Sequence, residues 1–208
     1  MRAVIFDLDG TLIDAAPDLA AKLNQVLATE GLAPLPVKTV QGLIGHGVRH
    51  FVTSGFAAQG MVMQPKHLEM FLALYPQAPE RHTVVYEGIF QALEQLKAQG
   101  RRLGLCTNKP EVATWPVLSA LRLAPFFDVV VTGDSTPYRK PDPRHLAMTL
   151  AALEVTDAIM VGDHENDMQA AAGLALPSIF CRWGYGEGVG TAQADTPADL
   201  PDIIAQLG

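Results

Sequence analysis

The first residues that could do chemistry are two carboxylates, Asp7 and Asp9, in the pentapeptide DLDGT at positions 7–11. The apolar run at 3–6 is too short for a helix and is followed by a Gly-Thr turn signal, so it predicts a buried strand that ends in both acids. Side chains two residues apart on a strand point the same way. Two close carboxylates repel unless a cation lies between them, and Mg²⁺ suits oxygen ligands. The alternative is a solvated turn at a strand end, where Asp and Gly are common.

Three further polar clusters come after later apolar runs. They are Thr107 with Asn108, then Lys140, then Asp163 with Asp167. Ligands of parallel α/β sheets bind at the carboxyl ends of the strands, so all four clusters are expected at one sheet edge.

Each of these clusters also has a purely structural interpretation. The segments at 107–110 and 163–167 could simply begin helices, because Asn caps helices, Pro starts them and acids suit their N-termini. Lys140 could be a solvated loop lysine. The clusters occur in an order that converges on one edge, which favours the functional interpretation of the set.

Together these groups supply what phosphoryl transfer needs, which is mainly positioning and charge neutralisation. An Asp beside a metal can act as a nucleophile, and a second Asp can protonate the leaving oxygen and then activate a water. Asp163 would complete the metal site. Lys140 offers a positive point charge, and Thr107 offers a hydroxyl next to backbone N–H groups that can hold phosphate oxygens.

The elements that must position these residues follow two patterns. Helical spacing from residue 19 to 74, with no convincing strand between 14 and 83, predicts an all-helical stretch. Beyond it, predicted strands alternate with predicted helices, which indicates a doubly wound parallel α/β sheet. The strands are expected at 103–106, 129–131, 158–161 and 178–180, and the helices at 87–98, 111–121, 143–153 and 166–174. We therefore predict a Rossmann-like core formed by residues 1–14 and 83–208, with a helical cap domain inserted at 15–82.

The composition narrows the class of protein. The 208 residues are 49% apolar and 18% charged, an ordinary globular composition, and the net charge of −7 without a basic run disfavours nucleic-acid or anionic-membrane partners. No run approaches the roughly 18 apolar residues of a membrane span, and the N-terminus does not resemble a signal peptide, so a cytoplasmic location is expected. Cys106 and Cys181 are expected to be buried free thiols. No motif indicates the oligomeric state.

At the four clusters the chain resembles the haloacid dehalogenase superfamily of phosphatases. The matching motifs are DLDGT at 7–11, TNKP at 107–110, KPDP at 140–143, and Gly162-Asp163 with Asp167. The resemblance implies that Asp7 is the nucleophile and Asp9 the acid/base. It implies Mg²⁺ held by the Asp7 carboxylate, the Asp9 backbone carbonyl and Asp163, with Asp167 in support. It also implies that Thr107, Asn108 and Lys140 hold the phosphate.

Within that superfamily the chain is similar to the bacterial phosphoglycolate phosphatases, at 14–19, 42–49, 132–135 and 184–186. This likeness implies hydrolysis of a small phosphorylated metabolite, with 2-phosphoglycolate as the first expectation, and it makes Asp134 a candidate for supporting the site. Ala15 and His164 depart from the family, which usually has Ser at both positions. The alternatives are a phosphatase for a sugar phosphate, a nucleotide or pyrophosphate, a phosphomutase, and a non-catalytic phosphate-binding regulatory protein on the same fold.

Substrate selection is expected from the cap, because a bare aspartyl-phosphate site would accept any phosphate that reaches it. The Gly45–Gly47 turn is flexible, and Arg49 follows it with a side chain suited to carboxylate recognition. We therefore predict that His46, Gly47 and Arg49 meet the non-phosphate end of the substrate. The alternative is a helix that starts at this turn, with Arg49 solvated.

Overall fold

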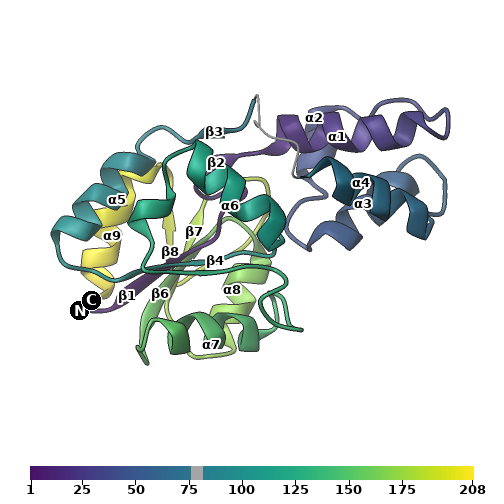
Figure 1. The fold of residues 1–208 in the computed structure, drawn as a ribbon. Coiled ribbons are helices and arrows are strands. Elements are labelled where there is room, and N and C mark those ends of the chain that lie inside the picture. Colours follow the sequence, from purple (N-terminus) through teal and green to yellow (C-terminus); the bar gives the residue numbers. More distant parts are fainter. Residues whose placement is uncertain (76–81) are drawn as a thin grey trace.

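The computed structural model describes residues 1–75 and 82–208 and is built on one six-stranded parallel sheet (Figure 1). Its order is β5-β4-β1-β6-β7-β8, which is the Rossmann order 3-2-1-4-5-6 when these strands are numbered along the chain. The strands are β1 (Ala3–Phe6), β4 (Leu103–Cys106), β5 (Val129–Val131), β6 (Ala158–Gly162), β7 (Ser178–Cys181) and β8 (Ala192–Ala194). The predicted doubly wound fold is confirmed.

Each face of this sheet packs into its own cluster of buried apolar residues. Val4 and Phe6 of β1 pack into one cluster and Ile5 into the other, as expected when alternate side chains of a strand point to opposite faces. Helices α5 (Ile89–Ala98), α6 (Glu111–Ala120) and α9 (Leu200–Leu207) cover the first face, and α7 (Pro143–Ala152) and α8 (Glu165–Ala172) cover the second. Both faces of the central strand are therefore buried, which explains its continuous apolar sequence.

Four helices gather beyond the sheet, at the upper right of Figure 1. They are α1 (Ala16–Ala28), α2 (Val37–Gln41), α3 (Val48–Ala57) and α4 (Pro65–Leu74). Pro17 and Pro65 lie in the first turns of α1 and α4, where proline costs no hydrogen bond. The division into a core of residues 1–14 and 83–208 and a cap of residues 15–82 stays a prediction, and residues 76–81 of that cap lie outside the described residues.

Several elements have no counterpart in the sequence-based assignment. Strands β2 (Ile13–Asp14) and β3 (Val84–Val85) pair antiparallel where the chain passes between the sheet and the four helices. Each of these strands has only two residues, which is too short to show an alternating apolar pattern. They form because they pair with each other. Strand β8 and helix α9 were also missed, although Leu200, Ile203, Ile204 and Leu207 have helical spacing. No helix within the described ranges has the length and apolar character needed to cross a membrane.

Candidate active site

The residues predicted to bind metal and phosphate or to catalyse the reaction lie at the carboxyl edge of the sheet. Asp7 directly follows β1 and its backbone N–H donates to the Val161 carbonyl of β6 at 2.9 Å. Thr107 follows β4 and its N–H donates to the Val131 carbonyl of β5 at 3.0 Å. Asp163 directly follows β6 (Ala158–Gly162). Parallel pairing therefore continues one residue past β1 and β4, which fixes where the side chains of Asp7 and Thr107 start.

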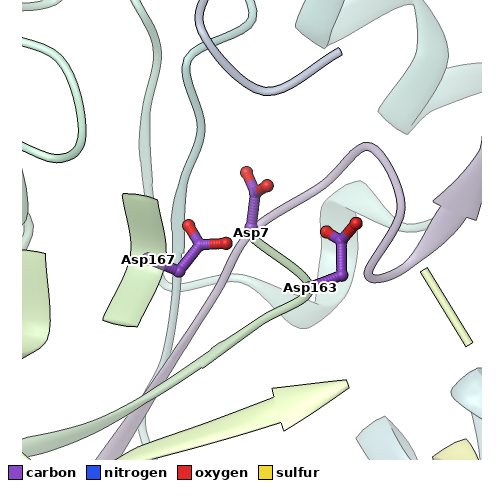
Figure 2. Close-up of side chains that lie close together, drawn as sticks. All are labelled: Asp7, Asp163 and Asp167. Atoms are coloured by element: carbon purple, nitrogen blue, oxygen red, sulfur yellow. The ribbon is translucent and has the colours of Figure 1, made fainter. Parts of the chain in front are cut away.

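Three carboxylates meet at this edge (Figure 2). One oxygen each of Asp7, Asp163 and Asp167 lies within 4.8 Å of the others, and all three residues are buried. Burial, followed by the charges of Asp7 and Asp167, raises the pKa of Asp163 to about 8. Burial also raises the pKa of Asp167 to about 7, against the opposing charge of Lys140. Such a cluster of oxygen ligands has the chemistry of a divalent-cation site.

Lys140 lies against two of these acids. Its Nζ is 2.9 Å from Asp7 Oδ1 and 2.6 Å from Asp167 Oδ1, and its side chain is 2% exposed. Burial lowers the pKa of the ammonium, but the Asp167 and Asp7 carboxylates raise it by more, so Lys140 stays charged. The interpretation of Lys140 as a solvated loop lysine is wrong.

The contacts of Lys140 Nζ and Asp167 Oδ1 are ion pairs without hydrogen-bond geometry. Both atoms are buried and have no hydrogen-bond partner within the described residues. Buried polar groups are almost always hydrogen-bonded, so two orphaned atoms at one place indicate a ligand site. An anion at the ammonium and a cation at the carboxylate would satisfy both.

Asp163 is held by neighbours on both sides. The Thr11 hydroxyl donates to its Oδ1 at 2.9 Å, and the Tyr185 backbone N–H donates to its Oδ2 at 2.8 Å. A Cβ added at Gly10 would lie 2.2 Å from Asp163 Oδ2, and Gly10 has a φ of +88°. Gly10 therefore leaves room for the Asp163 carboxylate and adopts the positive φ that the turn requires.

Asp167 and His164 form the start of helix α8. The backbone N–H of Asn166 donates to His164 Nδ1 at 3.1 Å, and the backbone N–H of His164 donates to Asp167 Oδ2 at 3.1 Å. This is a capping box in which an imidazole does what a serine hydroxyl usually does. The segment at 163–167 is thus both a helix start and part of the acidic cluster, and the departure at His164 keeps the cap.

Asn108 joins three parts of the chain. Its Nδ2 donates to the carbonyls of Gly45 and Lys140, both at 2.8 Å, and its Oδ1 accepts from the Lys140 backbone N–H at 2.9 Å. Asn108 therefore does not cap helix α6. The first N–H group of that helix, on Glu111, donates instead to Asp134 Oδ1 at 2.8 Å. Asp134 lies at that helix start and also accepts from the Thr132 hydroxyl.

Asp9 has a partner for which the sequence predicted no role. Lys109 Nζ lies 3.1 and 3.2 Å from the two carboxylate oxygens of Asp9, and the lysine side chain is 2% exposed. Burial raises the pKa of Asp9, which the charge of Lys109 only partly offsets. The sole sequence signal was the position of Lys109 within TNKP, because the pairing joins residues 100 positions apart.

A cavity of about 40 Å³ lies between the sheet edge and the four helices. Its sheet-edge side is formed by Asp7, Asp9 and residues 107–110. Its cap side is mostly apolar and consists of Leu19, Ile44, Gly45, Gly47, Val48, Phe51 and Tyr75.

The three predicted specificity residues are placed differently with respect to this cavity. Gly47 lines it, whereas His46 and Arg49 are not among the described residues that do. His46 Nδ1 lies 3.1 Å from Asn166 Nδ2, and its ring centroid lies 4.9 Å from that of His164. Arg49 is exposed and follows the first residue of α3. Their role in substrate selection stays a prediction.

Comparisons with known proteins agree with this geometry. A family model described as haloacid dehalogenase-like hydrolase matches residues 4–180. A phosphoglycolate phosphatase of Nitrosospira multiformis is 39% identical over 212 positions, covering 98% of this chain and 92% of the relative. One of Cereibacter sphaeroides is 41% identical over 189 positions, covering 89% and 87%. A crystal structure of a predicted phosphoglycolate phosphatase from Haemophilus somnus superposes with a TM-score of 0.86 at 25% identity, covering 98% of this chain and 97% of that one.

Proposed function

Since the chain belongs to the haloacid dehalogenase-like hydrolases, we propose that it is a Mg²⁺-dependent phosphatase whose substrate is 2-phosphoglycolate. The observation that carries the proposal is the meeting of Asp7, Asp163, Asp167 and Lys140 at one buried point of the sheet edge. The substrate follows from the names of relatives about 40% identical to this chain over most of its length.

The donor set fits Mg²⁺, because three buried carboxylates stand within 4.8 Å with a single ammonium between two of them. We assign the metal to Asp7, the Asp9 backbone carbonyl and Asp163, with Asp167 in support directly or through water. When bound, the ion would supply positive charge that offsets repulsion between the Asp7 carboxylate and a phosphate group.

In the first step a carboxylate oxygen of Asp7 attacks phosphorus. The bond from phosphorus to the ester oxygen breaks, and the leaving alkoxide takes its proton from the Asp9 carboxyl group. The raised pKa of Asp9 supports this role, because an acid must hold its proton until the leaving group needs it. The product is an alcohol, with the phosphoryl group on Asp7.

In the second step the Asp9 carboxylate takes a proton from a water molecule, whose oxygen attacks phosphorus. The bond between Asp7 and phosphorus breaks, which restores the Asp7 carboxylate, the protonated Asp9 and inorganic phosphate. Thr107 and Lys140, with the backbone N–H of Asn108, would hold the phosphate oxygens through both steps.

The test is a panel of phosphate esters assayed with Mg²⁺ and with a chelator. We expect kcat/KM to be highest for 2-phosphoglycolate, above a sugar phosphate, a nucleotide, pyrophosphate and an aryl phosphate. A chelator should abolish turnover and Mg²⁺ should restore it. A different best substrate would reject the substrate assignment alone, whereas no hydrolysis of any ester would reject the phosphatase itself.

A further inference from the structure

Lys109 is the only cationic side chain among the described residues that line the cavity. Its ammonium is fixed from two directions. Asp9 holds it at 3.1 and 3.2 Å, and the ring of Tyr75, from the cap side, lies with its centroid 5.5 Å from Nζ. The ammonium therefore stands where the sheet-edge side and the cap side of the cavity meet.

The two buried lysines, Lys109 and Lys140, contact different carboxylates of the site. Lys140 contacts Asp7 and Asp167 and does not line the cavity, so its charge serves the nucleophile and the transferred phosphate. Lys109 instead contacts Asp9, which is proposed to protonate the leaving oxygen. Lys109 is thus on the leaving-group side of the phosphorus.

A leaving group with a negative charge needs a cation at this place. It would share the cavity with the carboxylates of Asp7 and Asp9, while Ile44, Val48 and Phe51 offer only apolar surface. Like charges in a desolvated space repel strongly, and an ammonium there attracts strongly. The ammonium has three N–H donors and no acceptor, so it can contact the carboxyl group of Asp9 and an anionic group of the substrate at once.

We propose that Lys109 is a specificity-determining residue that binds an anionic group on the leaving-group side of a short phosphate monoester. For 2-phosphoglycolate that group is the carboxylate, one carbon away from the ester oxygen. The inference rests on the proposed function and assigns to Lys109 the part that the sequence suggested for Arg49. Because Lys109 Nζ lies 3.1 and 3.2 Å from the Asp9 carboxylate oxygens, the anionic group must lie close to the ester oxygen that Asp9 protonates.

The test compares 2-phosphoglycolate with 2-hydroxyethyl phosphate, which has a neutral CH₂OH in place of the carboxylate. In Lys109→Met, the ratio of kcat/KM for the acidic ester to that for the neutral ester should fall about tenfold or more, as expected for loss of a charged hydrogen bond. The fall should come mainly from a higher KM for 2-phosphoglycolate, and Lys109→Arg should restore part of it. An unchanged ratio would overturn the proposal.

Two other variants separate Lys109 from general positive charge. Lys22 also lies 5.5 Å from the Tyr75 ring centroid but does not line the cavity, so Lys22→Met should keep the wild-type ratio. The proposal is wrong if Lys22→Met lowers the ratio equally, or if Arg49→Ala lowers it and Lys109→Met does not. Failure of the wild-type protein on both esters would instead reject the proposed function.

A second measurement uses the unaltered protein and does not depend on whether Lys109→Met folds. Phosphonoacetate carries a phosphonate and a carboxylate on one carbon and cannot be hydrolysed at an ester bond. In a crystal structure of its complex, the carboxylate should lie within hydrogen-bond distance of Lys109 Nζ. A carboxylate bound to Arg49, or away from both residues, would contradict the proposal.

Discussion

The two sides of the cavity are held in place by different forces. On the sheet-edge side, Asp7, Asp167 and Lys140 are at most 11% exposed and are joined by ion pairs of 2.6 and 2.9 Å. On the cap side, the turn at Gly45 is attached to the core by hydrogen bonds from Asn108 and Asn166 to its carbonyl, at 2.8 and 3.2 Å. Changes on the first side should therefore have large and coupled effects, and changes on the second side small and separable ones.

The largest expected effect tests the nucleophile. Asp7→Asn should lower kcat on the order of 10⁴-fold or more, because an amide cannot attack phosphorus. The fold should survive, since the change keeps the shape of the side chain and relieves the crowding of three buried carboxyl groups. Steady-state kinetics, circular dichroism and mass spectrometry of the phosphorylated peptide would measure this. Full activity in the variant, or a phosphoryl group trapped elsewhere, would refute the assignment of Asp7.

The next effect combines activity and stability. Lys140→Met leaves Asp7 and Asp167 without their counter-charge, so the free energy of unfolding should fall by about 3 kcal/mol and kcat by about 100-fold or more. Urea unfolding would measure the first and kinetics the second. Lys97→Met is the matched control, because Lys97 pairs with Asp128 at 2.9 Å near the surface. That loss should cost less than about 1 kcal/mol. Equal costs for the two variants would mean that burial does not distinguish the pairs.

Metal removal should make stability depend on pH. Without metal, Asp163 and Asp167 keep protons up to pKa values of about 8 and about 7, whereas the unfolded chain releases them near 3.8. The folded state then binds more protons, so its stability falls as the pH rises toward 8. Burial lowers the pKa of His145 from 6.5 to about 4, which has the opposite effect below pH 6.5. The informative window is therefore about pH 6.5 to 8.

In that window the Tm in excess chelator should decrease as the pH rises. Added Mg²⁺ should raise the Tm by more at pH 8 than at pH 6.5, because a metal binds the deprotonated carboxylates. Melting curves at several pH values, with and without Mg²⁺, would show both trends. A Tm in chelator that stays constant or rises with pH would contradict this account of the acidic cluster.

The smallest effect belongs to the cap side. Asn166→Ala removes contacts to the Gly45 carbonyl and to His46, so the KM for the substrate should rise a few-fold while kcat changes little. The free energy of unfolding should fall by about 1 kcal/mol. Asn24→Ala is the control, because Asn24 makes two hydrogen bonds to Leu35 within the four-helix part. It should cost similar stability and leave KM unchanged, and a KM change in both variants would remove the special role of the Gly45 contact.

The sequence predicted the sheet-edge side better than the cap side, for a physical reason. Strand ends in a parallel sheet deliver their residues to one edge, so Asp7, Thr107 and Asp163 could be placed together from the order of strands alone. Nothing comparable orients a helix, and the pattern around Arg49 did not reveal that its side chain lies outside the cavity lining.

Contacts between distant segments were also beyond the sequence. Tyr185 donates its hydroxyl hydrogen to Asp14 Oδ1 at 2.6 Å, and its oxygen accepts from the Ala15 N–H at 2.7 Å. The hydroxyl of Tyr185 thus makes hydrogen bonds at the end of β2, next to Ala15, which has no hydroxyl. The pairing spans 171 residues, and no local propensity could anticipate it.

The three hydrogen bonds of Asn108 determine what a movement of the turn at Gly45 would break. Two of them go to the main chain of Lys140 and one to the turn at Gly45. If that turn swings away to admit a substrate, Asn108 loses only the single bond to Gly45. The two hydrogen bonds between Asn108 and the main chain of Lys140 would then stay in place, so the Lys140 ammonium would keep its position beside Asp7 and Asp167.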